Sequence, residues 1–379
     1  TKDRALVQCH DIGLEFFTNT NNKMTIKVWV GGGLGRTPII GSVIKSELEW
    51  EHILTYCEAI LRVYNLYGRR DNMYKARIKI LVKSLGIEAF KKLVEDEWKY
   101  IKNGPNTINT EELSRIKNYF SEPDYKKDIK NNLKDYKSNK AFNQWLSRST
   151  NTHKKKGYRA VTFSLKETGC APGDASSTQM RAVSNLSDEY SFGEIRVSHE
   201  QNLILADVQE DKLYELWVKA KEYHLVTPNI GLLTDIICCP GGDFCSLANA
   251  KSIPIAQSIQ DLFNDMDYLH DIGDLNINIS GCMNACGHHH VGHIGILGVD
   301  KDGSEWYQVT LGGNQGNFAS IGKVIGPSFS AEQMPFIIKK IIEVYLNNRQ
   351  EEEIFIDCVS RIGLEPFKNY IYTDSEVSK

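Results

Sequence analysis

The pattern of apolar and polar positions near the start of the chain predicts strands followed by helices. Residues 26–36, IKVWVGGGLGR, read as a strand that ends in a run of glycines, where the chain can turn. Residues 52–67, HILTYCEAILRVYNLY, repeat apolar side chains at helical spacing, and Gly68 follows as a C-terminal stop. Residues 1–97 therefore predict an α+β unit.

The middle of the chain changes character and then returns to the same kind of pattern. Residues 98–150 are rich in Lys, Asn, Asp and Ser with scattered apolar anchors, which predicts a helical connector over the surface. Beyond it, residues 157–231 alternate again. Within them, 158–166 predicts a strand and 211–225 an amphipathic helix.

A weak internal repeat links the two ends of the chain. HDIGL from His10 leads to VWVGGGLG, IIGSVI and the helix AILRVYNLYGRR, while HIGIL from His293 leads to YQVTLGG, IGKVIG and the helix KIIEVYLNNR. The order predicts two copies of one α+β unit. The second copy is preceded by residues 157–231 and by cysteines, whereas the first has nothing before it. We therefore expect an N-terminal partner segment that this sequence does not include.

Composition narrows the class of protein. A chain of 379 residues with 41% hydrophobic and 25% charged side chains is typical of a soluble globular protein of two or three domains. The formal net charge of -3 argues against a nucleic-acid or anionic-membrane partner recognised by bulk charge. Neither a long apolar run nor a signal-peptide layout is present, so we expect a cytoplasmic location.

The cysteines carry the candidate chemistry. Nine are present, an odd count that favours reduced thiols, and five fall between positions 238 and 286, which favours metal over disulfides. Cys239 and Cys245 are separated by PGGDF, and Cys282 and Cys286 by MNA. The first spacing is wide for a zinc knuckle and suits a loop around an iron–sulfur cluster. From the spacing alone, zinc and buried thiols remain alternatives.

The cysteine motif resembles that of the sulfite and nitrite reductase haemoprotein family. C-x5-C is followed by GC-x-N-x-CG-x-HH-x-x-x-IG, and the likeness to the assimilatory bacterial branch extends over nearly the whole chain. The other segments that carry it are HDIGL, VGGGLGRTPIIG, EAILRVYN-x-YGRRDN-x-YKARIKIL, APGDASSTQMRAV, FGEIRVSHEQNL and TPNIGLLTDII. The resemblance implies two cofactors, sirohaem and a [4Fe–4S] cluster.

The resemblance also implies ligands. Cys239, Cys245, Cys282 and Cys286 would hold the cluster, and Cys286 would also bridge to the sirohaem iron. A cluster that shares a thiolate with the haem iron is an electron relay with almost no gap. The histidines at 288–290 are expected to form a polar turn that packs against the macrocycle, with metal binding as the alternative.

Sirohaem carries many carboxylates, which need cations and N–H donors. Arg70, Arg77 and Lys79 match basic positions of the family, and on a helix Arg70 and Arg77 would share one face; a solvated charged face is the alternative. Gln201 and Asn202 are expected to line the haem side, with ordinary sheet-surface polarity as the alternative.

The resemblance implies an α+β fold of pseudo-twofold repeated units with a ferredoxin-like half-domain. We expect residues 1–97 to be the C-terminal part of the first catalytic-type domain and residues 98–150 to be a helical connector. The half-domain would span 151–231, the cluster-bearing domain 232–349 and a tail 350–379.

The implied activity is that of the haemoprotein component of an assimilatory sulfite reductase, the six-electron reduction of sulfite to sulfide. The alternatives are reduction of nitrite to ammonia and a non-catalytic iron–sulfur electron-transfer fragment. No flavin or nicotinamide motif is present, so electrons would come from a separate flavoprotein or ferredoxin. The catalytic residues that grip the substrate are expected upstream of Thr1, which would make this chain the C-terminal part of a longer reductase.

Overall fold

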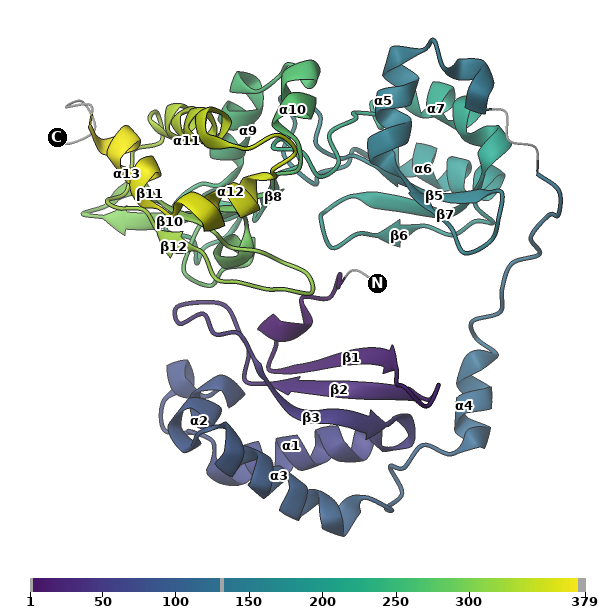
Figure 1. The fold of residues 1–379 in the computed structure, drawn as a ribbon, viewed down its shortest axis with the longest axis vertical. Coiled ribbons are helices and arrows are strands. Elements are labelled where there is room, and N and C mark those ends of the chain that lie inside the picture. The colour runs from purple at the N-terminus through teal and green to yellow at the C-terminus, as the bar shows by residue number, and fades with distance from the viewer. Residues whose placement is uncertain (1–2, 130–132, 374–379) are drawn as a thin grey trace. The chain divides into compact units, whose positions relative to one another are not determined.

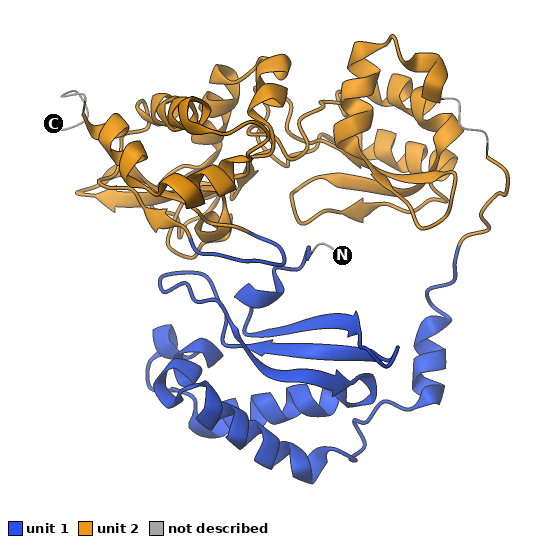
Figure 2. Cartoon of the chain, viewed as in Figure 1, with its two compact units in different colours: residues 1–122, 315–321 blue, residues 123–314, 322–379 orange. Residues whose placement is uncertain are grey.

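The computed structural model describes residues 3–129 and 133–373. Contacts divide the chain into two compact units (Figure 2). Unit 1 comprises residues 1–122 and 315–321, and unit 2 comprises residues 123–314 and 322–379.

Unit 1 is an antiparallel sheet in the order β1-β2-β3 with helices packed on one face (Figure 1). Alternate side chains of β2 (Ile26, Val28 and Val30) are fully buried against α1, which begins at Ile53 and ends before Gly68, as the apolar pattern predicts. The elements are η1 (Val7–Cys9), β1 (Ile12–Thr18), β2 (Met24–Val30), β3 (Ser42–Glu49), η2 (Trp50–His52), α1 (Ile53–Tyr67), η3 (Met73–Lys75), α2 (Ile78–Leu85), α3 (Ile87–Ile101) and α4 (Thr110–Lys117).

The first half of unit 2 is a four-stranded antiparallel sheet in the order β4-β5-β7-β6, covered by helices. Phe142 and Trp145 of α5 are fully buried in its core, so the end of the segment expected as a surface connector belongs to this core. Its elements are η4 (Leu133–Tyr136), α5 (Lys140–Ser149), β4 (Thr150–Thr152), β5 (Tyr158–Phe163), α6 (Ser177–Tyr190), β6 (Arg196–Val197), β7 (Leu203–Gln209), η5 (Glu210–Lys212) and α7 (Leu213–Lys221).

The predicted strand over 158–166 forms but is shorter. β5 ends at Phe163 because the next side chains turn into buried polar contacts: Ser164 Oγ donates to Asn229 Oδ1 at 2.7 Å, and Lys166 forms a buried ion pair with Asp235.

The second half of unit 2 is a five-stranded mixed sheet in the order β12-β11-β10-β9-β8, in which β8, β9 and β10 run parallel. Its apolar core is the largest of the described residues. The elements are β8 (Ile237–Cys238), α8 (Gly241–Phe244), α9 (Ile253–Leu262), α10 (Met266–Ile272), β9 (Ile277–Ser280), η6 (His289–Val291), β10 (Ile294–Lys301), β11 (Ser304–Leu311), β12 (Lys323–Val324), α11 (Met334–Asn348), α12 (Phe355–Ile362) and α13 (Glu365–Tyr372).

The internal repeat is confirmed in the geometry. In each copy a short 3-10 helix, η1 or η6, begins after a residue in the left-handed conformation and leads into a hairpin, β1–β2 or β10–β11. Each hairpin ends at a left-handed glycine, Gly31 (φ 74°) or Gly312 (φ 84°). The C-caps of the two 3-10 helices are His10 and Gly292, so the two histidines that open the repeat in sequence are not structurally equivalent. The fold is α+β with repeated units, as predicted.

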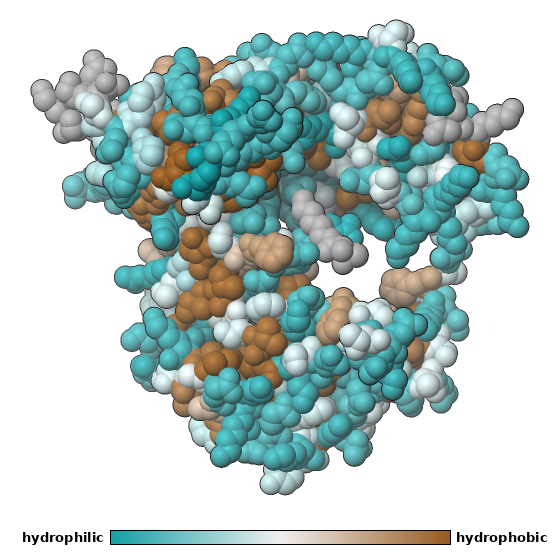
Figure 3. Space-filling view, viewed as in Figure 1, coloured by the Kyte–Doolittle hydropathy of each residue, from teal (hydrophilic) through white to brown (hydrophobic). Residues whose placement is uncertain are grey.

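No helix of the described residues is long and apolar enough to cross a membrane. On the face drawn in Figure 3, hydrophilic side chains predominate and apolar patches lie between them.

Candidate metal centre

Two loops of unit 2 carry the motif cysteines. Cys239 directly follows β8 and Cys245 caps the C-terminus of the short helix α8, while Cys282 and Cys286 lie in the loop after β9. Because β8 and β9 are neighbouring parallel strands, both loops begin at the same end of the sheet, where the carboxyl ends of these strands lie. The sheet topology therefore brings together two cysteine pairs that lie far apart in the sequence.

Backbone hydrogen bonds join the two loops. The N–H of Gly281 donates to Sγ of Cys239 at 3.1 Å. In the other direction, the N–H groups of Asn249 and Ala250 donate to the carbonyl oxygen of Gly281 at 2.8 and 3.0 Å. Hydrogen bonds in both directions therefore hold the two loops together, and Sγ of Cys239 accepts one of them.

Glycine is required where the loops approach each other most closely. A Cβ on Gly281 would lie 2.5 Å from the carbonyl oxygen of Ala250, and a Cβ on Gly241 would lie 2.4 Å from the backbone nitrogen of Ser252. Gly241 also has a φ of 58°, which L side chains rarely adopt. The glycines of the motif therefore set how closely the cysteine loops pack.

All nine cysteines are free thiols, and the four of the motif differ in exposure. Cys282 is buried, Cys239 and Cys245 are half-buried, and Cys286 is exposed. Burial, followed by the neighbouring thiols of Cys239, Cys282 and Cys245, raises the pKa of Cys286. The thiol of Cys286 therefore lies close enough to those of Cys239, Cys282 and Cys245 for their charges to affect it.

This donor set fits an iron–sulfur cluster. Soft thiolates are the ligands that such clusters use, and N–H donors to the ligand sulfur tune their potential. Among the described residues, no group of three or more His, Cys, Asp or Glu side chains could hold a single metal ion. The irons of a [4Fe–4S] cube each take their own thiolate, so the four thiolates need not surround one point.

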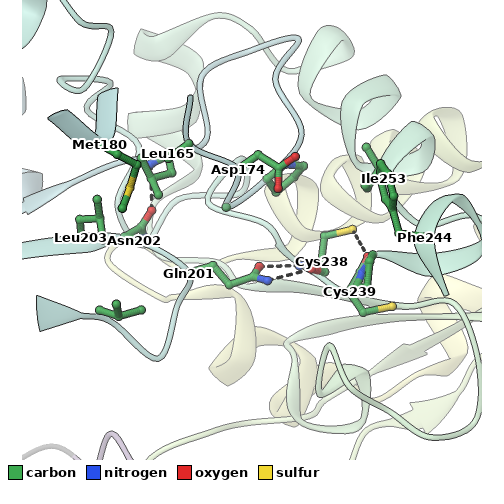
Figure 4. A pocket seen from close by; sticks show the side chains of 15 residues that line it. Leu165, Asp174, Met180, Gln201, Asn202, Leu203, Cys238, Cys239, Phe244 and Ile253 are labelled. Carbon is green, nitrogen blue, oxygen red and sulfur yellow. Dashed lines mark hydrogen bonds between the residues drawn. The ribbon is translucent and has the colours of Figure 1, made fainter. Parts of the chain in front are cut away.

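Cys238 differs from its neighbour Cys239. Its side chain is buried, its Sγ donates to the carbonyl oxygen of Cys239 at 3.2 Å, and burial raises its pKa (Figure 4). Such a thiol is a structural side chain.

The histidines after Cys286 form a tight turn. Ala285 and His288 adopt left-handed conformations with φ of 59° and 55°, which places Cys286 on a strained loop. His289 is fully buried, its ring centroid lies 3.9 Å from that of His290, and neither of its ring nitrogens has a hydrogen-bond partner among the described residues. Burial, with smaller contributions from His290 and His288, lowers the pKa of His289 to about 3, so this ring is neutral at pH 7.

The cations predicted for sirohaem lie in unit 1 and are engaged by protein groups. Arg70 donates to Asn65 Oδ1 at 2.5 Å and lies over the Tyr64 ring, 4.7 Å from its centroid. Arg77 pairs with Asp11 at 2.7 Å. The stretch is not one helix, contrary to the helical-face argument. Arg70 follows α1, and Arg77 is the N-cap residue of α2. Between them lies the 3-10 helix η3, which begins where the side chain of Asn72 accepts a hydrogen bond from the Tyr74 N–H.

Lys79 is buried and holds the glycine turn that follows β2. Its Nζ donates to the carbonyl oxygens of Gly33, Leu34 and Thr37 at 3.3, 2.8 and 2.7 Å. Burial, and then the charge of Arg77, lowers the pKa of Lys79. Contact of Arg70, Arg77 and Lys79 with sirohaem stays a prediction, and their protein partners were not visible in the sequence.

Gln201 and Asn202 are likewise engaged. The side-chain amide of Gln201 pairs with the backbone of Cys238 (Figure 4). Asn202 accepts from the N–H of Leu165 at 3.1 Å and donates to Asp235 Oδ1 at 3.1 Å. These residues border a pocket of about 390 Å³ that also reaches Cys239. Their predicted contact with the haem stays a prediction.

Comparison with known proteins finds two family models that match this chain. Residues 1–102 and 232–379 match the family model described as the nitrite and sulphite reductase 4Fe-4S domain. Residues 152–223 match the nitrite/sulfite reductase ferredoxin-like half domain.

Individual relatives are similar at low identity. The chain is 25% identical to sulfite reductase [ferredoxin] 1 of Mycolicibacterium paratuberculosis, over 95% of this chain and 60% of that protein. It is 26% identical to the assimilatory ferredoxin-dependent nitrite reductase of Haloferax mediterranei, over 97% of this chain and 61% of that protein. The solved structure of the Mycobacterium tuberculosis NirA protein matches with a TM-score of 0.72 at 22% identity, over 96% of this chain and 62% of that chain. The chain thus spans about 60% of the length of these relatives.

Proposed function

Because the chain belongs to the nitrite and sulphite reductase 4Fe-4S domain family, we propose that Cys239, Cys245, Cys282 and Cys286 hold a [4Fe–4S] cluster that works with sirohaem. The observation that carries this assignment is the bond from the Gly281 N–H to Sγ of Cys239, which joins the two cysteine loops around sulfur. When bound, the two cofactors supply one-electron transfer and the iron at which an oxyanion is reduced.

The protein's own residues hold and tune this centre. Four thiolates bind the irons, and the Gly281 N–H places a hydrogen bond on one of them, which stabilises the more negative, reduced state. Cys286 is the most exposed of the four, which supports the proposal that its thiolate would also hold the sirohaem iron. Gly287, beside it, is buried, and a Cβ there would lie 1.9 Å from the carbonyl oxygen of Ile279, so glycine lets the loop of Cys286 pack directly on β9.

For the reaction, we propose the reduction of sulfite to sulfide by the haemoprotein component of a sulfite reductase. The sequence motifs and the similarity to sulfite reductases support it. Reduction of nitrite to ammonia is the second candidate, because a nitrite reductase matches at 26% identity over 97% of the chain. Several relatives are named as ferredoxin enzymes, which supports a separate ferredoxin as the electron donor.

The cluster assignment is tested by anaerobic reconstitution of the chain with iron and sulfide, followed by assay of iron and acid-labile sulfide. The parent should retain a [4Fe–4S] cluster, and Cys245→Ser should lose or convert it. Cys170→Ser, which changes an exposed cysteine outside the two loops, is the matched control and should match the parent. Full iron retention by Cys245→Ser, or zinc in place of iron in the parent, would contradict the assignment.

Because the chain spans about 60% of the length of its relatives and the residues that grip the substrate are predicted to lie outside it, the substrate is tested on a version that is extended upstream and loaded with sirohaem. Dye-driven reduction is compared with sulfite and with nitrite as the only acceptor. A higher kcat/KM for sulfite is expected, and a clear preference for nitrite would favour the second candidate.

A further inference from the structure

The strand that leads into the first cluster cysteine lies at the edge of its sheet. Among the described strands, β8 pairs only with β9, and the N–H of Cys239 donates to the carbonyl oxygen of Ile279 on that side at 3.1 Å. The backbone groups of the residue before it, Cys238, face away from β9. An edge strand leaves such groups without a ladder partner, and buried backbone groups need one.

Gln201 supplies that partner. Its Oε1 accepts from the N–H of Cys238 at 2.9 Å, and its Nε2 donates to the carbonyl oxygen of Cys238 at 2.8 Å (Figure 4). A primary amide presents a donor and an acceptor side by side, as a peptide group does. One side chain from the β6–β7 connection therefore substitutes for a further strand at the edge of the cluster-bearing sheet.

The position of Gln201 is itself fixed. Its backbone is left-handed, with a φ of 57°, which is strained for a residue with a side chain. The next residue, Asn202, is completely buried and bonded to Asp235, and Asp235 pairs with the buried Lys166 at 2.6 Å. This network anchors the loop that presents the amide.

We infer that Gln201 is a positioning residue for the cluster: it fixes the backbone of Cys238 and thereby the direction in which Cys239 presents its thiolate. The inference rests on the proposed cluster. It differs from the haem-lining role expected from the sequence, because both polar atoms of the Gln201 amide are used by the backbone of Cys238.

Two substitutions separate the contributions of the amide. Gln201→Ala removes both hydrogen bonds. Gln201→Glu keeps an acceptor for the Cys238 N–H, but a carboxylate cannot donate to the Cys238 carbonyl oxygen. Each lost bond should make opening of this edge about fivefold more frequent, the ratio that about 1 kcal/mol gives at 25 °C. The carboxylate of Gln201→Glu would also face the Cys238 carbonyl oxygen, which repels it, so we expect more frequent opening in both variants.

The control is Gln257→Ala. Gln257 lies on α9, and its Nε2 donates to the carbonyl oxygen of Gly169 at 3.0 Å. This change also removes a glutamine-to-backbone hydrogen bond between the two halves of unit 2, but neither Gln257 nor Gly169 belongs to a cysteine loop.

Two measurements on the full chain test the inference. Hydrogen exchange at the Cys238 amide, on the chain without cluster, should be faster in both Gln201 variants and unchanged in Gln257→Ala. After reconstitution, the alanine variant should release iron to a chelator faster, and its cluster should show a more negative reduction potential and an altered EPR spectrum, because the Gly281 N–H bond to Cys239 is loosened.

The outcomes can be told apart. If Gln201→Ala matches Gln257→Ala in exchange, iron release and potential, the positioning role is wrong. If exchange is faster but iron release and potential stay at the parental values, Gln201 only closes the sheet edge and the inference fails as well. A parent chain that takes up no cluster would instead contradict the proposed function and remove the premise.

Discussion

The backbone N–H of Gly281 lies 3.1 Å from Sγ of Cys239 and donates to it, although the two residues belong to loops that follow different strands. The bond forms only because Gly281 has no side chain, since a Cβ there would lie 2.5 Å from the carbonyl oxygen of Ala250. The spacing between the cysteine loops therefore depends on Gly281, where the backbones of the two loops are in contact.

A Gly281→Ala substitution should separate the two loops. The carbonyl group of Ala250 belongs to the backbone and cannot move aside as easily as the tip of a side chain. We therefore expect the hydrogen bond to Cys239 to be lost, and the reconstituted chain to hold substantially less iron and sulfide. Iron per chain after desalting is the measurement. Gly242→Ala is the control in the same region, because its Cβ would meet the nearest atoms at an ordinary 3.4 Å. Equal iron retention by the two variants would show that the close approach is not required.

The buried pair of Lys166 and Asp235 should be important for the stability of unit 2. The Lys166 side chain is 0% exposed and that of Asp235 3%, with Nζ and Oδ1 2.6 Å apart. Lys166→Met leaves a buried carboxylate without its cation, which costs about 3–5 kcal/mol in comparable pairs. The free energy of unfolding, from urea titration followed by tryptophan fluorescence, should fall by that order.

An exposed pair in the same unit provides the comparison. Lys140 and Asp267 lie 2.7 Å apart with 71% and 65% of their side chains exposed. Lys140→Met should change the free energy of unfolding by less than about 1 kcal/mol, because water already screens this pair. Similar losses in the two variants would mean that burial of Lys166 does not decide the stability.

The sequence predicts those features that depend on local spacing. The helix that stops at Gly68, the strand before Gly31 and the two cysteine pairs all follow from patterns within a few residues. The repeat also follows, although its register is shifted because His10 and His293 are not equivalent.

The partners of the candidate site residues could not be predicted in this way. Gln201 lies 37 residues before Cys238, Arg77 lies 66 residues after Asp11, and Lys166 lies 69 residues before Asp235. No periodic pattern connects such positions, and each partnership exists only once the strands and loops have packed. A cation or an amide can therefore be expected at a cofactor from a motif and still be held by the protein's own backbone and carboxylates.

The buried ring of His289 should make the stability of unit 2 depend on pH. Burial, with smaller effects of His290 and His288, holds its folded pKa at about 3, below the ordinary histidine value of about 6.5. The unfolded chain therefore binds a proton that the folded chain does not as the pH falls from about 6.5 toward 3. Over that window this residue should lower the free energy of unfolding by about 1.4 kcal/mol per pH unit.

Other groups titrate in the same window, so the test is a difference between two proteins. Urea unfolding of the parent and of His289→Phe is measured at pH 7 and at pH 5. The phenylalanine ring cannot take up a proton, so the parent should lose more stability than the variant over this interval, by up to about 2 kcal/mol. The comparison is made on the chain without iron, so that loss of a cluster at low pH cannot contribute. Parallel pH profiles would mean that His289 finds a proton acceptor or water in the folded state, and that its ring is not isolated in the interior.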